Sequence, residues 1–289
     1  MSTLRSGVSL QIGISTRNRW DDLRNTLLKL AEFESQASGI LIFDDGSDSP
    51  CPYDVASICA TAELKRFPES KGYIVRRNQL AQEMTSKYYL SLDDDSFPVA
   101  GSLESSMEFA ESCKDLFCLS FPIYNPVTGE QQVASLQDKP YKVRSFVGCG
   151  HLLHRGQFLD LGGYREELVH QCEEVELSAR AFQRGLYCYH YPGLQIHHTE
   201  SRAGRNLHRM DFYGARNNVL WNDWFVPSRL KLIKQSRTLA ARAALFLRTG
   251  RIGHAQGQIA GFKDALKYQT NRQQMSLTLY REWKRLPVQ

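Results

Sequence analysis

Short apolar runs alternate with amphipathic stretches along the first 120 residues. Leu23, Leu27 and Leu30 recur at the spacing of one helix face and follow an apolar run at 8–14. The continuous apolar run at 40–43 is typical of a parallel strand buried on both faces. Further strands are predicted near 63–67, 88–92 and 116–121, and helices near 53–61, 72–85 and 102–113. This alternation predicts an α/β fold with a Rossmann-like, mostly parallel sheet and helices on both faces.

The pattern changes after residue 122. Segments 131–135 and 142–147 alternate like the strands of a hairpin, and a one-sided helix is expected between Glu173 and Gly185. Helical stretches are expected from Pro227 to 249 and over 254–285. We therefore expect one domain over 1–227, with a first half at 1–122 and a second at 123–227. A basic helical C-terminal extension follows over 228–289.

Charge divides the chain at the same place. Residues 228–289 carry 13 Lys and Arg against 2 Asp and Glu, and the remainder carries 23 against 29. A basic amphipathic helix can lie as a peripheral contact on an anionic membrane surface, or it can cover a core and leave its charge in water. Nucleic-acid binding is disfavoured because no recognition motif is present.

Cysteine usage and hydropathy exclude several classes of protein. The seven cysteines are an odd number without a Cys-x-x-Cys pair, which disfavours a disulfide framework and a zinc site. The sequence contains no run of about 18 apolar residues, the length that a helix needs to span a bilayer, and the first residues lack the apolar core of a signal peptide. We expect a cytoplasmic protein, peripheral at the inner face of the membrane if the basic extension binds lipid.

Three carboxylates, Asp93, Asp94 and Asp95, follow directly on the apolar run at 88–92. Repulsion and desolvation both oppose three negative charges at the end of a buried strand, and a bound cation removes that cost. Mg²⁺ and Mn²⁺ prefer oxygen ligands and often bridge to phosphates. The segment predicts a metal that holds a diphosphate, with an acidic cap on a helix starting near Gly101 as the alternative.

Two other strands of the predicted sheet also end in polar clusters. The clusters are Ser15, Thr16 and Arg17 after the first strand, and Asp44 and Asp45 after the second. Ligands of parallel sheets bind beyond the carboxyl ends of the strands. Together with the aspartate trio, these clusters predict one shared ligand site at that edge.

Seven short segments occur in an order found in one enzyme family. They are Ser15-Thr-Arg-Asn, Asp44-Asp-Gly-Ser, Gly72-x-x-x-Arg-Arg-Asn78, Asp93-Asp-Asp95, Gly162-Gly-Tyr, Glu173-Glu-Val-Glu-Leu and His197-His198. Each segment alone is common, whereas the ordered set is specific. Over residues 8–220, the chain thus resembles a bacterial family-2-type inverting glycosyltransferase with the GT-A fold.

The resemblance implies a nucleotide-sugar donor, expected to be a UDP-sugar, bound across the first half of the domain. Asp45 would accept a hydrogen bond from the base, and Arg76 or Arg77 would lie over the base or beside the phosphates. The structural alternatives are a turn at Asp45 and a solvated helix face for the arginines. The implied donor-binding residues are Ser15, Thr16, Arg17, Asp45, Arg76, Arg77, Asp93 and Asp94.

The resemblance also implies Mn²⁺ or Mg²⁺ at the aspartate trio. Asp95 would be the main ligand, Asp93 would contact the metal or the ribose, and Asp94 would contact the ribose. His197 or His198 would complete the shell, and a histidine ligand suits Mn²⁺ better than Mg²⁺. The cation would stabilise the charge that develops on the departing diphosphate.

The catalytic base is expected at the helix that follows the Gly-Gly turn. In inverting members an acidic pair begins this helix and its second residue takes the acceptor's proton, which assigns the role to Glu174, with Glu173 as the second candidate. The usual residue is Asp, one methylene shorter than Glu174. Glu176, one turn from Glu173, is expected to point into the same site. The alternative is charge complementarity at a helix N-terminus.

The resemblance assigns Arg216 and Asn217 to the acceptor side. The acceptor is expected to be a hydroxyl of a glycan, a lipid-linked sugar or a small molecule, as in polysaccharide biosynthesis. One competing interpretation is a nucleotidyltransferase acting on sugar phosphates, which is disfavoured because 15–19 lacks glycine. The other is a non-catalytic module that binds a nucleotide sugar or a glycan. Such a module would not need both the aspartate trio and the later acidic pair Glu173 and Glu174. A retaining transferase would share the donor half.

Overall fold

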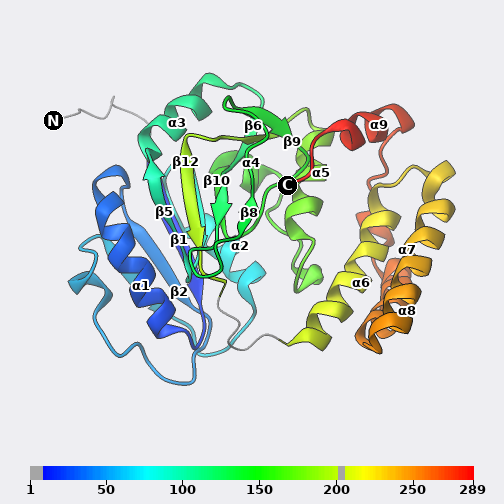
Figure 1. Cartoon of the computed structure of the whole chain (residues 1–289), viewed down its shortest axis with the longest axis horizontal. Coiled ribbons are helices and arrows are strands. Elements are labelled where there is room, and N and C mark those ends of the chain that lie inside the picture. Colours follow the sequence, from blue (N-terminus) through cyan, green and yellow to red (C-terminus); the bar gives the residue numbers. More distant parts are fainter. Residues whose placement is uncertain (1–8, 201–205) are drawn as a thin grey trace.

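An eight-stranded sheet lies at the centre of the computed structural model, which describes residues 9–200 and 206–289 (Figure 1). Its strands are β1 (Leu10–Thr16), β2 (Ile40–Asp44), β3 (Ala62–Arg66), β4 (Tyr88–Asp93), β6 (Leu116–Ser120), β9 (Tyr141–Val143), β10 (Gly150–His154) and β11 (Tyr187–His190). They lie in the order β3-β2-β1-β4-β10-β6-β11-β9. Strands β3, β2, β1 and β4 are parallel to one another, and β10 is antiparallel to both of its neighbours, β4 and β6. The expectation of a mostly parallel sheet is confirmed for this half.

Strand register brings the polar strand ends together. Ser15 lies beside Asp93 in the pairing of β1 with β4, and Thr16 lies beside Asp44 in the pairing of β1 with β2. Parallel strands end at a common edge, so the three clusters that follow them share one side of the molecule. This is the edge at which the sequence predicts a ligand.

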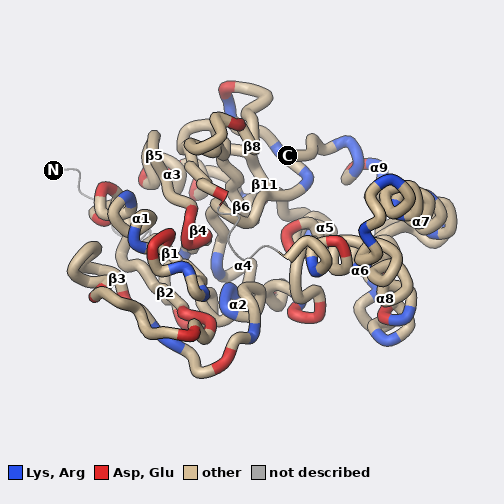
Figure 2. The backbone as a smooth tube through the Cα atoms, turned by 60° about the horizontal axis from the view of Figure 1, so that its bottom comes forward, with Lys and Arg blue, Asp and Glu red and all other residues tan. Residues whose placement is uncertain are grey.

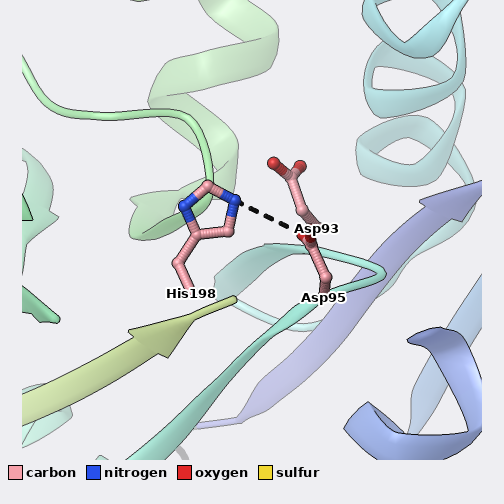
Figure 3. Close-up of side chains that lie close together, drawn as sticks. All are labelled: Asp93, Asp95 and His198. Carbon is pink, nitrogen blue, oxygen red and sulfur yellow. Dashed lines mark ion pairs between the residues drawn. The ribbon is translucent and has the colours of Figure 1, made fainter. Parts of the chain in front are cut away.

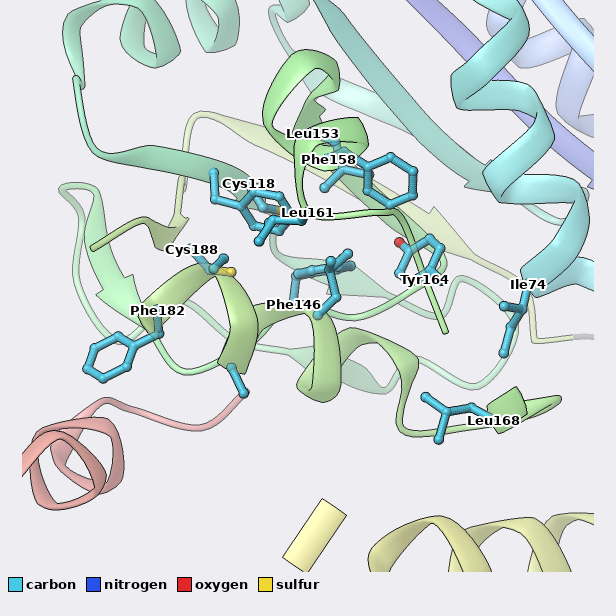
Figure 4. Packing of buried hydrophobic residues seen from close by; sticks show 14 of the residues in the cluster. Ile74, Cys118, Phe146, Leu153, Phe158, Leu161, Tyr164, Leu168, Phe182 and Cys188 are labelled. Atoms are coloured by element: carbon cyan, nitrogen blue, oxygen red, sulfur yellow. The ribbon is translucent and has the colours of Figure 1, made fainter. Parts of the chain in front are cut away.

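Helices cover both faces of the sheet, because side chains of each strand alternate between two hydrophobic clusters. One cluster contains Ile42 of β2 together with residues of α1 (Trp20–Leu30) and α3 (Leu103–Ser112). The other contains Phe43 of β2 together with residues of α2 (Tyr73–Glu83) and α5 (Glu173–Gln183). Figure 4 shows part of the second cluster, with Phe158, Tyr164 and Leu168 among its labelled residues.

A smaller sheet corrects two predictions. It contains β5 (Ser96–Gly101), β12 (Leu194–His198), β7 (Ile123–Tyr124) and β8 (Gln131–Val133), in that order. The aspartate trio therefore leads into a strand, not directly into a helix. The predicted hairpin is wrong, because β8 pairs with β7 and β9 pairs with β11. The alternation of apolar and polar residues within a strand does not identify its partner strand, so the sequence pattern could not predict these pairings.

The remaining helices are α4 (Arg155–Asp160), α6 (Leu207–Phe225), α7 (Ser228–Thr249), α8 (Gly253–Lys267) and α9 (Leu277–Arg285). Short 3₁₀ turns are η1 (Ala31–Gln36), η2 (Val55–Ser57), η3 (Glu166–Leu168) and η4 (Gln269–Asn271). The helix predicted near 53–61 is only η2, and the helix predicted over 254–285 is broken between α8 and α9. Across the described ranges, no helix is long and apolar enough to cross a membrane.

Helices α6, α7 and α8 stand side by side beyond the sheet (Figure 1). Gly257 of α8 lies so close to α6 that an added Cβ would overlap the backbone carbonyl of Phe212. Basic residues are frequent on α7, α8 and α9, whereas acidic residues gather near β1, β4 and the start of α5 (Figure 2). The extension is therefore packed directly on the last helix of the preceding domain, and it carries the opposite charge from the strand-end edge.

Candidate active site

Asp93, Asp95 and His198 form a compact acidic and imidazole cluster (Figure 3). One ligand atom from each residue lies within 4.8 Å of the others. Asp93 ends β4, and β12 brings His198 opposite Ser96 in its pairing with β5. His198 Nε2 lies 3.4 Å from Asp95 Oδ1. Two carboxylates and one imidazole are a donor set that suits Mn²⁺ or Mg²⁺.

The orientation of His198 fits a metal ligand. Its Nδ1–H donates to Gln132 Oε1 at 3.0 Å, so Nε2 faces Asp95 and can offer its lone pair to a metal when the ring is neutral. Burial opposes protonation of this ring, but Asp95 and Cys149 outweigh it and raise the pKa of His198 to about 11. Hydrogen bonds with His198 and Arg19 outweigh burial at Asp95 and hold its pKa below the usual range. The cluster therefore favours a positive charge between these groups.

The two adjacent histidines do not share this role. Successive side chains of a strand point to opposite faces, so His197 lies on the far side of β12 from the acidic cluster. Its ring lies near Phe97 and Tyr124, with centroid distances of 6.0 and 5.4 Å. Of the two ligand candidates, the structure brings His198 to Asp93 and Asp95 and turns His197 away.

Arg19 is a member of this region that the sequence analysis missed. It precedes α1 and contacts Asp95 at 2.6 Å, Asp94 at 3.1 Å and Asp22 at 3.0 Å. The predicted donor residue Arg17 is instead exposed. Arg17 and Arg19 both follow β1 and are separated by one residue. The sequence pattern therefore gives no reason to choose Arg19 over Arg17 as the site residue.

Asp94 is not one of the three residues of the metal cluster. It is buried, accepts a hydrogen bond from Thr16 Oγ1 at 2.8 Å and forms an ion pair with Arg19 at 3.1 Å. Burial raises its pKa to about 8, with the neighbouring Asp95 adding to the shift. Thr16 is itself buried, whereas Ser15 is half-buried at the edge of β1. Thr16 and Arg19 thus hold the Asp94 carboxyl at the end of β4.

Asp45 is enclosed by donors from the loop before α2. It accepts hydrogen bonds from Ser70 Oγ, from the backbone N–H groups of Lys71 and Gly72, and from Arg76 Nε, at 2.6–2.9 Å. These bonds outweigh burial and hold the pKa of Asp45 below its usual range. The Arg76 side chain is 2% exposed. Asp45 thus fixes the loop at 70–72, and it does not present a free carboxylate edge.

Arg76 and Arg77 point in different directions from α2. Arg76 stacks on Phe67, with 3.7 Å between its Cζ and the ring centroid. Arg77 is buried, pairs with Asp93 and donates to the carbonyl oxygen of Gly148 at 3.0 Å. Its Nη1 also lies 3.9 Å from Glu173 Oε1. Arg77 therefore connects the metal cluster with the acidic start of α5.

Glu173 and Glu174 are the first residues of α5 and lie beside Arg77. Glu173 is 1% exposed and accepts a hydrogen bond from the Tyr73 hydroxyl at 2.6 Å, while its other carboxylate oxygen has no partner among the described residues. Glu174 lies against Gly148, where an added Cβ would overlap its carboxylate. Burial raises the pKa of both carboxyls, and the charge of Glu173 raises that of Glu174 further. Such a carboxyl can hold or release a proton near neutral pH.

Glu176 does not join this pair, contrary to expectation. Its side chain is fully buried and pairs with Arg165 at 2.6 Å and with Arg180 at 2.7 Å. Arg180 lies four residues further along the same helix, the spacing that favours such an ion pair. Glu176 is therefore neutralised on the inner side of α5.

Arg216 and Asn217 also turn inward. Arg216 pairs with Asp264 of α8 at 2.6 Å and donates to the Glu167 carbonyl oxygen at 2.8 Å. Asn217 is fully buried, and its side-chain amide contacts three backbone carbonyl oxygens of the loop before α5, those of Leu168, His170 and Gln171. Neither side chain is open to an acceptor, and both hold the segment that leads to Glu173.

A family model described as "Glycosyl transferase family 2" matches residues 11–162. No curated protein matches the chain. Similar solved structures include GalNAc-T7 with UDP, GalNAc and Mn²⁺, at 16% identity and a TM-score of 0.59 over 75% of this chain and 48% of that one. The mannosyltransferase PcManGT from Pyrobaculum calidifontis, in complex with GDP-Man and Mn²⁺, gives 14% and 0.57 over 96% and 78%. S. aureus TarS gives 12% and 0.54 over 92% and 54%. The chain thus spans about half the length of the first and third of these proteins.

Proposed function

Because the chain belongs to glycosyl transferase family 2 and is a glycosyltransferase with the GT-A fold, we propose that it moves a sugar from a nucleotide-sugar donor to an acceptor hydroxyl with inversion at the anomeric carbon. The observation that carries the proposal is the placement of Asp93, Asp95 and His198 near the acidic pair Glu173 and Glu174, with Arg77 between them. Family membership excludes the nucleotidyltransferase and non-catalytic readings.

We propose a UDP-sugar as the donor and Mn²⁺ as the metal. GalNAc-T7 holds UDP and Mn²⁺, which supports this choice, and the mannosyltransferase PcManGT holds GDP-Man and Mn²⁺, which supports a nucleotide-sugar donor and the metal. Asp93, Asp95 and His198 would hold the cation. When bound, it would neutralise the negative charge that collects on the diphosphate leaving group. Mg²⁺ is the alternative, and an imidazole ligand favours Mn²⁺ over it.

The donor base and ribose would lie along the strand ends of β1 and β2. Asp45 holds the loop at 70–72 through the backbone N–H groups of Lys71 and Gly72. We propose that Asp45 and Arg76 shape the base site through this loop, with Ser15 and Thr16 at its floor. Asp94, Arg19 and Thr16 would support the ribose side by fixing the strand end.

Glu174 would act as the general base. Its carboxylate would accept the proton of the acceptor hydroxyl while that oxygen forms a bond to the anomeric carbon. The bond between this carbon and the phosphate oxygen breaks, and its electron pair leaves with the nucleoside diphosphate. The raised pKa of Glu174 suits this transfer, because a stronger base takes the proton more readily. Tyr73 and Arg77 would keep Glu173 in place beside it.

The acceptor proposed is a glycan, a lipid-linked sugar or a small molecule with a free hydroxyl. All seven cysteines are free thiols, which supports a reducing compartment such as the cytoplasm. Exposed aliphatic side chains accompany the basic residues of α7 and α8, among them Leu232, Leu247 and Leu266. This combination supports a peripheral contact with an anionic membrane through 228–289.

A panel of UDP-, GDP- and dTDP-sugars tests the proposal. Thermal unfolding with and without Mn²⁺ identifies the donor, because a ligand that binds the folded state raises its stability. Turnover of that donor is then followed by release of the nucleoside diphosphate, and NMR of the product gives the anomeric configuration. Inversion is expected, and a product of retained configuration would contradict the role of Glu174.

A further inference from the structure

A cavity of about 440 Å³ lies where the helical extension meets the rest of the chain. Its walls come from α5, α6, α7 and α9 and from Arg144, which follows β9. The volume is within the range of small-molecule sites. None of the metal-cluster or donor-side residues lines it. The cavity is therefore separate from the site described above.

Four cationic side chains line this cavity: Arg144, Lys234, Arg237 and Lys284. No Asp or Glu of the described ranges does so. Elsewhere in the extension, carboxylates of α6 pair with three of the cations, Lys231, Arg251 and Arg272. Arg251 pairs with Asp211 at 2.6 Å, and no ion pair of the described residues includes any of the four cavity cations. Positive charge is thus concentrated here without a counter-charge from the protein.

Arg144 is held rigidly at the cavity wall. Its guanidinium donates to the carbonyl oxygens of Trp283, Lys284 and Leu286 at 2.8–3.2 Å. These acceptors are neutral, so they fix the group without cancelling its charge. Burial, Arg144 and Lys234 together lower the pKa of Lys284, which places the three cations within electrostatic reach of one another. A bound anion would relieve this repulsion.

The cavity also offers aromatic surface. Trp221 and Tyr280 provide flat apolar walls. A phosphate has several strong acceptor oxygens, and guanidinium and ammonium groups are its usual partners. The lining therefore matches a phosphate attached to a ring or an apolar chain.

We propose that this cavity binds the phosphate group of an anionic acceptor. Naming the occupant an acceptor rests on the proposed function, whereas the phosphate chemistry rests on the cavity alone. Cys172 and Val175 belong to the cavity wall and flank Glu173 and Glu174 in the first turn of α5. An acceptor anchored here would lie against the same helical turn that carries the base.

Titration calorimetry with phenyl phosphate tests the site. The wild-type chain should bind it at one saturable site, and the double variant K234A/R237A should bind at least about 10-fold more weakly, since two charged hydrogen-bond donors are lost. The matched control R248A/K263A removes two exposed cations outside the cavity and should bind within about twofold of wild type. Equal affinity of K234A/R237A and wild type, or no binding by wild type, would overturn the proposal.

Two further arms separate the sources of phosphate and guard against misfolding. R237E, at an exposed position, should abolish phenyl phosphate binding while keeping the melting temperature of the wild type. Binding of glucose 6-phosphate would indicate that the ligand is a soluble phosphate ester. Binding to phosphatidylglycerol vesicles but not to phosphatidylcholine vesicles would indicate a lipid headgroup, provided that K234A/R237A loses this binding. Donor binding is measured on the same samples with a UDP-sugar and Mn²⁺. Donor binding without phosphate binding overturns the phosphate site and leaves the proposed function standing. Phosphate binding without donor binding overturns the proposed function, and with it the naming of the occupant as an acceptor, and leaves the phosphate site standing.

Discussion

Asn217 donates a hydrogen bond from its side-chain amide to the carbonyl oxygen of Gln171 at 2.8 Å, and Gln171 adopts a left-handed φ of 67°. Val169 and Cys172 also have positive φ values, of 63° and 76°. Such backbone is costly for residues with side chains and persists where neighbouring contacts hold it. A buried amide on α6 therefore holds the strained loop that ends at Glu173.

Replacing Asn217 with Ala should loosen this loop. We expect a loss of about 1–3 kcal/mol in unfolding free energy, because a fully buried hydrogen-bonding group is removed and carbonyl oxygens are left without a partner. We also expect kcat to fall more than KM changes, since the base is displaced and the donor site is intact. Chemical denaturation and steady-state kinetics measure the two effects. Asn218→Ala, at the exposed neighbouring position, is the stability control, and equal losses in both variants would refute the role of Asn217.

Glu174→Gln should abolish turnover and stabilise the fold at neutral pH. The pKa of Glu174 is raised in the folded chain, so its contribution to stability is present below the unfolded pKa and is lost as pH rises through the folded pKa. The variant removes this dependence and should gain about 2–4 °C in Tm for each kcal/mol relieved at pH 8. Wild-type kcat should rise with pH above the usual carboxyl range. A Tm difference that does not change between pH 5 and 8 would contradict this assignment.

His198→Ala and His197→Ala form a matched pair on one strand. Loss of a ligand should weaken Mn²⁺ binding by at least about 10-fold in His198→Ala. His197 points to the other face of β12, so His197→Ala should keep its affinity. Electron paramagnetic resonance of free Mn²⁺ in the presence of UDP gives both values without turnover. Equal weakening in the two variants would show that the cluster does not select one histidine.

Gly148→Ala should disturb the base without unfolding the chain. An added Cβ overlaps the Glu174 carboxylate and comes within 3.0 Å of Arg77 Nη1. We expect kcat to fall by at least about 10-fold, as for other small displacements of catalytic groups. Gly156→Ala is the control, because its Cβ would have ordinary contacts, with 3.4 Å to His154. Wild-type kcat in Gly148→Ala would place the base elsewhere.

The sequence pattern predicted the elements that depend on interactions between residues close together in the chain. The apolar runs gave the strands of the parallel half, and strand alternation explains why only His198 of the histidine pair reaches the aspartates. Strand alternation could also have separated His197 from His198 in the sequence, if the segment that forms β12 had been assigned as a strand. The acidic start of α5 was also predicted, with its end at Gly185, where φ is 74°.

Non-local contacts account for the parts that were missed. β8 and β9 pair with partners that periodicity does not reveal. Arg19 and Arg17 look alike in sequence, and only the turn before α1 directs Arg19 to Asp95. The inward direction of Asn217 depends on a loop 46–49 residues away along the chain. Such roles follow from tertiary structure and have no local signal.

Calorimetric titration of a UDP-sugar into the protein, with and without Mn²⁺, tests the central claim most directly. Saturable binding that requires Mn²⁺ is expected for the wild type, and Asp95→Asn should bind at least about 10-fold more weakly, because one charged ligand of the Asp93–Asp95–His198 cluster is removed. Binding of the donor that is equally strong without the metal, or unchanged in Asp95→Asn, would contradict the account.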